Sequence, residues 1–105
     1  MSEPIELELA IPADHPAYAG HFPGAPVLPG VVLLDAALAA ARAHGALGTG
    51  PFRIAYAKFF RFVTPGDALV LQQRVGVDGG IDFEIASAAG RVASGRFVRI
   101  AASSP

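Results

Sequence analysis

Residues 31–43 contain no helix breaker, and this stretch restricts the fold of the 105-residue chain more than any other feature. It is rich in Val, Leu and Ala and precedes His44-Gly45, a favourable C-terminal stop. We therefore predict a helix over this stretch, starting near Pro29-Gly30. Only Asp35 and Arg42 interrupt its apolar surface. A helix that is apolar nearly all round is typical of a buried helix, so other elements must cover its faces.

The segments on either side of the helix are strand-like. Residues 5–11 alternate between apolar and polar side chains, which is the period of a strand with one buried face. Four further strands are predicted at 52–63, 68–77, 81–88 and 91–101, joined by short turns that suit antiparallel hairpins. Such a sheet can bury the helix if it curves around it. We predict an α+β hotdog fold, a curved antiparallel sheet wrapped around one long central helix, with residues 1–105 as one domain.

Two residues near the predicted helix are candidates for chemistry. His21 lies in a loop, Pro12–Gly30, whose many Pro and Gly residues exclude regular structure and make it rigid. Its imidazole titrates near neutrality, although it could simply bond a backbone carbonyl. The presence of Asp35 on a helix that is predicted to be buried needs an explanation, because a carboxylate is costly to bury. The alternative reason, attraction to the helix dipole, contributes roughly 0.3 to 1 kcal/mol, which is too little to offset full burial.

The segment from Gly20 to Asp35 reads GHFPGAPVLPGVVLLD and resembles the signature of the beta-hydroxyacyl-acyl carrier protein dehydratases of the FabA/FabZ type. In that family a His-Phe-Pro-Gly loop leads through Pro-Gly into the central helix and its acidic residue, with the same spacing between His21 and Asp35. Residues 57–67 also resemble the family's strand and Pro-Gly-Asp turn. The two matches cover about a quarter of the chain and agree with the predicted order of elements.

The resemblance implies reversible dehydration of a (3R)-3-hydroxyacyl thioester to the trans-2-enoyl thioester, in fatty acid synthesis or a specialised lipid pathway. It makes His21 the base and Asp35 its acidic partner. It also assigns oxyanion stabilisation to the Gly30 amide, and amides at a helix start suit that role. The Val27 carbonyl would orient the His21 ring. Alternatively, Gly30 serves only a tight turn and Val27 only packs.

The same resemblance implies partners. The acyl group would arrive on the phosphopantetheine of an acyl carrier protein, and neither metal nor cofactor would be needed. The active form would be a homodimer in which the histidine and the acid of one site come from different subunits. Lys58, Arg61 and Arg53 are candidates for docking the carrier, or simply form a solvated strand face. No Cys or second His lies at metal-ligand spacing from His15 or His44 in the sequence, so we expect both to be surface residues and predict no metal site.

Composition excludes several classes of function. The 8 basic and 9 acidic residues create no overall field that would attract nucleic acid or an acidic membrane. No signal peptide or membrane-spanning run is found, so we expect a cytoplasmic protein. The absence of cysteine excludes disulfides and thiolate catalysis. A hydrophobic fraction of 52% with only 16% charged residues favours an oligomer, although an alanine-rich composition alone could explain it.

The chain departs from the family at several points. Ala39 replaces a common glutamine, and Ala17-Tyr18-Ala19 replaces a more aromatic approach to the histidine, which affects substrate range or rate. An aspartate at position 35 occurs in members that also isomerise the double bond, but one residue does not decide that activity. The short chain suggests a specialised lipid, polyene or polyketide pathway. Two alternatives stay open: an acyl thioesterase, disfavoured by the His21 loop, and a catalytically silent acyl-binding subunit, disfavoured by His21 together with Asp35.

Overall fold

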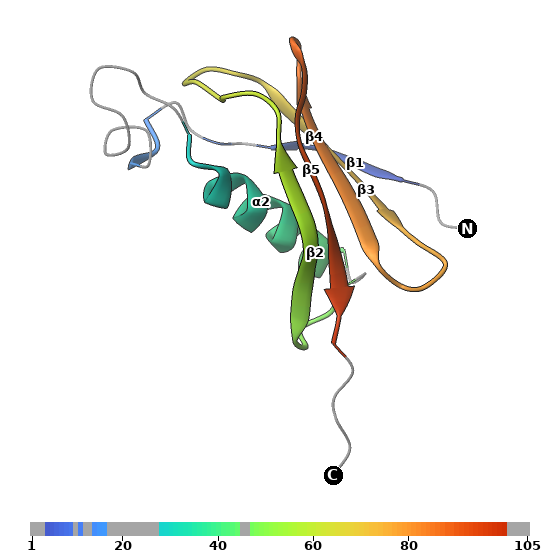
Figure 1. Ribbon diagram of the computed structural model, residues 1–105. Helices are drawn as coiled ribbons and strands as arrows, with labels where there is room; N and C mark the ends of the chain where they lie inside the picture. Colours follow the sequence, from blue (N-terminus) through green and yellow to red (C-terminus); the bar gives the residue numbers. More distant parts are fainter. Residues whose placement is uncertain (1–3, 10, 12–13, 17–27, 45–46, 101–105) are drawn as a thin grey trace.

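A five-stranded antiparallel sheet with one helix across it makes up the described structure (Figure 1). It is a computed structural model that describes residues 4–9, 11, 14–16, 28–44 and 47–100. In chain order the elements are β1 (Ile5–Leu9), α2 (Gly30–Ala43), β2 (Phe52–Phe59), β3 (Leu69–Val75), β4 (Ile81–Ser87) and β5 (Gly90–Arg99). The order in the sheet is β1-β3-β4-β5-β2, so β1 and β2 are its edges. The predicted α+β hotdog class is confirmed.

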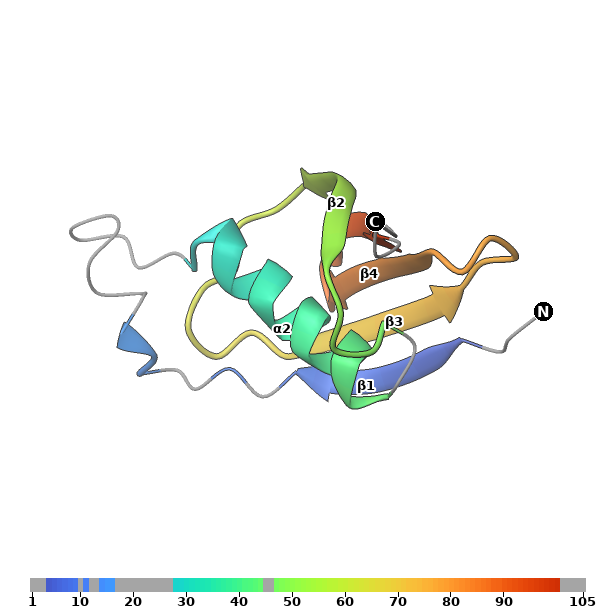
Figure 2. The ribbon, with the colours of Figure 1, turned by 90° about the horizontal axis from the view of Figure 1, so that it is seen from below.

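The core lies between α2 and one face of the sheet, which we call the inner face (Figure 2). Register places residues of like kind side by side there, as in the pairs Leu71 with Ile85 and Ile81 with Phe97. The Phe97 ring stacks on Phe83 with centroids 5.1 Å apart. Burial of these large side chains provides the main stabilisation of the fold, because the free energy gained scales with the apolar area removed from water.

A single polar side chain on the inner face links the sheet to the helix. Gln73 occupies an inward position of β3 and is only 4% exposed, and its Nε2 donates a hydrogen bond of 2.7 Å to the Ala37 carbonyl. Ala37 lies in the middle of α2, so this bond joins the middle of the helix to β3, the strand next to the β1 edge. A buried amide requires such a partner.

The connection from α2 to β2 is held by Arg42. Its Nη1 donates to the carbonyls of Gly48 at 2.6 Å and Gly50 at 3.3 Å. The guanidinium also lies 5.1 Å from the centroid of the Phe52 ring, at the start of β2. This explains why a charged residue interrupts an otherwise apolar stretch: its head leaves the helix and closes the loop that follows.

The sheet does not cover the whole helix. The buried side of α2 consists of Leu33, Ala37 and Ala41. An exposed stripe runs along the helix through every fourth residue, Val31, Asp35, Ala39 and Ala43. The prediction that the sheet covers all faces of the helix is therefore wrong for the single chain. Within the described residues, no helix is long and apolar enough to cross a membrane.

Candidate active site

Asp35 lies on the exposed stripe of α2, between Val31 and Ala39. Its carboxylate makes no hydrogen bond or ion pair with any residue that the structure describes. The expectation that Asp35 is buried is wrong for the single chain, so the helix carries no desolvation cost there. The first turn of α2 contains no acidic residue, so the dipole effect, which fades beyond that turn, does not explain Asp35 either. The Asp35 carboxylate can therefore contact a substrate or a second chain outside the described core.

Gly30 begins α2, as predicted. The residue before it, Pro29, occupies the N-cap position and provides no side-chain hydrogen bond to the helix. The Pro29 carbonyl accepts from the Val32 amide at 3.0 Å. Helix geometry leaves the first amides without intrahelical acceptors, so the start of α2 presents donors for a developing negative charge.

The start of α2 is held by the segment that follows β2. The Leu28 amide donates to the Val63 carbonyl at 2.8 Å, and both side chains are buried. Phe59, the last residue of β2, packs its ring against the Gly30 backbone. The sequence alone predicts no role for Phe59, although this residue lies in the second stretch that resembles the dehydratase signature, residues 57–67.

His21 and Val27 lie outside the described residues. Their proposed roles, as the base and as the carbonyl that orients it, therefore stay predictions. Of the predicted site, the structure describes the two residues on α2, which are Gly30 at the start of the helix and Asp35 further along it.

The three predicted docking residues do not share one surface. Register pairs Arg53 with Val98 and Lys58 with Ser94, which places both basic side chains on the outer face of β2. Lys58 Nζ lies 5.8 Å from the centroid of the Tyr56 ring. Arg61 follows the end of the strand, and its guanidinium packs against the backbone of Gly90.

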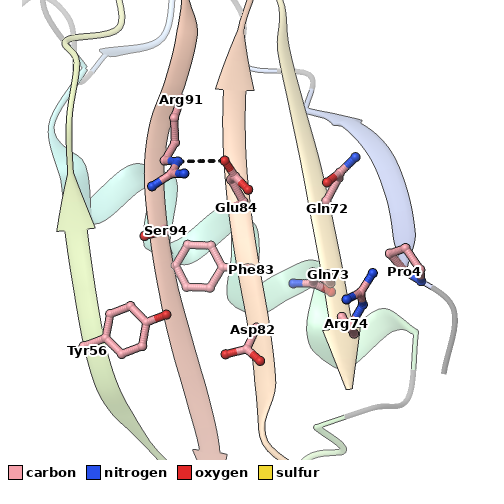
Figure 3. A pocket seen from close by; sticks show the side chains of 10 residues that line it. All are labelled: Pro4, Tyr56, Gln72, Gln73, Arg74, Asp82, Phe83, Glu84, Arg91 and Ser94. Atoms are coloured by element: carbon pink, nitrogen blue, oxygen red, sulfur yellow. Dashed lines mark hydrogen bonds and ion pairs between the residues drawn. The ribbon is translucent and has the colours of Figure 1, made fainter. Parts of the chain in front are cut away.

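Two surface hollows lie away from Asp35. One, of about 420 Å³, opens on the outer face of the sheet and is lined mainly by polar side chains of β2, β3, β4 and β5, with Phe83 and Pro4 among them (Figure 3). In Figure 3, α2 passes behind the strands, and an ion pair of 2.9 Å joins Arg91 to Glu84 on the near side. The other, of about 630 Å³, is lined by residues 60–62, 66–68 and 87–89. Neither lining includes a residue of α2, so neither is the candidate site.

The described residues contain no group of three or more His, Asp or Glu side chains placed to hold a metal ion. His44 ends α2 as its C-cap, and its amide donates to the Ala40 carbonyl at 3.1 Å. The described part of the candidate site thus consists of acid and amide groups on α2, and His21 precedes this helix in the sequence.

Comparison with known proteins decides the family. The family model described as "ApeI-like: ApeI dehydratase" matches residues 1–96. The chain belongs to the ApeI-like dehydratase family. A curated relative, the 3-hydroxyacyl-[acyl-carrier-protein] dehydratase FabZ of Wolbachia pipientis wMel, is 41% identical over 70 residues, which is 59% of this chain and 48% of the relative. The chain spans about half the length of the curated relatives it matches.

Solved structures confirm the fold of this family member. The dehydratase heterocomplex ApeI:P from Xenorhabdus doucetiae contains a chain with a TM-score of 0.79 and 24% identity, covering 90% of this chain and 85% of that one. A thioesterase from Thermus thermophilus has a TM-score of 0.57 and 16% identity, covering 95% of this chain and 86% of that one. Because a dehydratase and a thioesterase share the fold, the fold alone does not decide the function, which depends on the residues of the site.

Proposed function

We propose that this chain is a 3-hydroxyacyl-thioester dehydratase that acts on substrates bound to an acyl carrier protein. One observation carries the proposal: the family match covers residues 1–96, a range that includes His21 and Asp35, and Asp35 occupies the open stripe of α2. The pathway would be fatty acid synthesis or a specialised lipid pathway. A carrier-bound substrate also places the chain in the cytoplasm.

The proposed chemistry is an elimination. His21 takes the proton from C2 of the 3-hydroxyacyl thioester while the Gly30 amide donates to the thioester oxygen, on which negative charge develops. Protonated Asp35 then gives its proton to the departing C3 hydroxyl, so the C3–O bond breaks, the double bond forms between C2 and C3, and water leaves. Transfer of the proton from His21 to Asp35 restores both groups. The reaction needs neither a metal nor a cofactor.

The exposed position of Asp35 supports a shared site. An acid that faces away from its own core suits a site completed by a second subunit, with the acid from one chain and the histidine from the other. The edge strand β2 supports an interface as well, because Ile54 and Tyr56 are 45% and 43% exposed there. Exposed edge strands with apolar side chains are favourable pairing surfaces. A homodimer is the proposed active form.

The decisive test is hydration of a trans-2-enoyl thioester, followed by loss of the ultraviolet absorbance of the conjugated double bond. Wild-type protein would consume a crotonyl or trans-2-octenoyl carrier-protein thioester and yield the 3-hydroxyacyl product, identified by mass. His21→Ala and Asp35→Asn would both be inactive. A folded wild-type protein that binds these thioesters without turnover would instead be a silent acyl-binding subunit. Release of free thiol would indicate a thioesterase.

Arg61 is the docking candidate that the surroundings favour most. It makes no ion pair with a described residue, and it lies near the segment that holds the start of α2, whereas Arg53 and Lys58 lie on the outer face. Arg61→Glu would raise KM for a carrier-bound enoyl thioester about tenfold, since a charge reversal at an interface costs on the order of 1.4 kcal/mol or more. KM for the same acyl group on free pantetheine would not change. An equal effect on both substrates would remove Arg61 from the docking surface.

A further inference from the structure

The start of α2 requires glycine because of space, not because of backbone conformation. Gly30 is not among the glycines with positive φ, so its backbone is open to any L-residue. A Cβ at this position would lie 2.8 Å from Cε1 and 2.9 Å from Cζ of Phe59, closer than real Cβ contacts. The tight-turn explanation for Gly30 is therefore replaced by direct packing of an aromatic ring on its backbone.

The ring is firmly placed on the inner side of β2. Phe59 pairs with Ala93 of β5, and the next amide, that of Phe60, donates to the Val92 carbonyl at 2.8 Å. Further along the same segment, the Val63 carbonyl accepts a hydrogen bond from the Leu28 amide, two residues before Gly30. These contacts matter more than usual because no side chain caps the helix, so packing and one backbone bond hold its first turn.

We propose that Phe59 is a positioning residue that sets the direction of the Gly30 amide toward the thioester oxygen, an inference that rests on the proposed function. An oxyanion donor is effective only when it is held in place before the reaction, and a misplacement of about 1 Å can cost about 100-fold in rate. The flat Phe59 ring provides that support. It contacts the Gly30 backbone on one side, and about half of its surface stays exposed.

Phe60 offers a matched control, because it is adjacent and has the same exposed fraction, 48%. Its ring lies 5.2 Å from the Arg91 guanidinium carbon, and the three atoms nearest to a Cβ at Gly30 all belong to Phe59. In hydration of trans-2-octenoyl-pantetheine, Phe59→Ala would lower kcat about 10- to 100-fold with KM changed less than about threefold, as expected when a transition-state contact is weakened. Phe60→Ala would keep the wild-type kcat, and Phe59→Leu would be intermediate. Circular dichroism and sedimentation would verify fold and assembly of each variant.

Gly30→Ala tests the same contact from the side of the helix. The added methyl group must displace the ring or the helix start, so this variant alone would lose kcat about 10-fold or more. In Gly30→Ala/Phe59→Ala the ring is gone, so the two losses would not multiply. Phe59 has no positioning role if folded Phe59→Ala keeps kcat within twofold of Phe60→Ala, or if the two losses multiply. An inactive wild-type protein would instead overturn the proposed function, and this inference with it.

Discussion

Gln73 is the residue on which the position of α2 depends most directly, because its amide is the one buried polar side chain among the described residues. Its Nε2 reaches the Ala37 carbonyl, which in a helix is also the acceptor for the amide four residues later. The bond therefore adds a second donor to a carbonyl that is already satisfied. Because the carbonyl keeps its helical partner, the loss of stability on substituting Gln73 should depend on the group that replaces the amide.

Gln73→Leu should destabilise the protein by about 1 kcal/mol, because it removes one hydrogen bond and leaves no unpaired group behind. Gln73→Glu should cost several kcal/mol, since it buries a carboxylate that faces a carbonyl oxygen. Urea unfolding at neutral pH measures both changes. Equal losses for the two variants would show that position 73 is solvated in solution, in contrast to its 4% exposure here.

Gly30 and Asp35 show which parts of a site the sequence can predict. Residue type and spacing were sufficient to place both on one helix, because helix signals are local. The reason for Gly30 was not predictable, since it depends on Phe59, a distant residue brought there by pairing of β2 with β5. The sequence pattern does not predict that Asp35 is exposed, because Ala39 and Ala43 on the same side of the helix count as apolar residues. An alanine side chain is so small that exposing it costs little free energy, so this side of the helix can face solvent.

At the scale of elements, the hairpins were the most predictable part of the fold. Gly79 and Gly90 have φ of 83° and 130°, conformations that favour glycine, at the two turns predicted around β4. The predicted turn before β3 is also present, where the Thr64 amide donates to Asp67 Oδ2 at 2.9 Å. The strand before that turn ends at Phe59, four residues earlier than predicted, and beyond it the Val63 carbonyl bonds the Leu28 amide just before α2.

The hairpin between β3 and β4 carries an ion cluster whose strength depends on pH. Arg96 of β5 contacts Asp78 in the turn at 2.5 Å and Asp82 of β4 at 2.9 Å. The hydrogen bond from Arg96 lowers the pKa of Asp78, with a smaller contribution from the Gly80 amide, and the same carboxylates raise the pKa of Arg96. Because the folded pKa of Asp78 is below its unfolded value, its contribution to stability is complete above about pH 4 and is lost as pH falls through the folded pKa.

Asp78→Asn should therefore lower the unfolding midpoint slightly at pH 7, and the difference from wild type should shrink on acidification below about pH 4. The effect stays small because the pair is exposed to solvent. Thermal unfolding across this pH range measures it, with Asp67→Asn in another turn as the comparison. A difference that is constant with pH would mean that the change acts through turn geometry and not through charge.

At the scale of the whole molecule, the proposed dimer predicts that two inactive variants recover activity when they are combined, which a site within a single chain could not do. If the histidine and the acid of each site come from different subunits, a dimer of His21→Ala with Asp35→Asn contains one site with two defects and one intact site. Random assembly of the two variants gives half such mixed dimers, so co-refolded protein should recover about a quarter of wild-type activity from two inactive parents. Recovery should be absent when the variants are mixed without exchange of subunits.

The alternative outcomes of this mixing experiment separate the possible assemblies. If both residues acted within one chain, every subunit in the mixture would keep one defect and no activity would return. If β2 paired with a non-identical chain instead of a second copy, the wild-type protein would sediment as a monomer and lack activity by itself. Ile54→Lys provides the control for the interface, because a charge on the exposed inner side of β2 should weaken association at neutral pH without touching Asp35. Its activity should then rise with protein concentration, as expected when the active site forms only where two subunits meet.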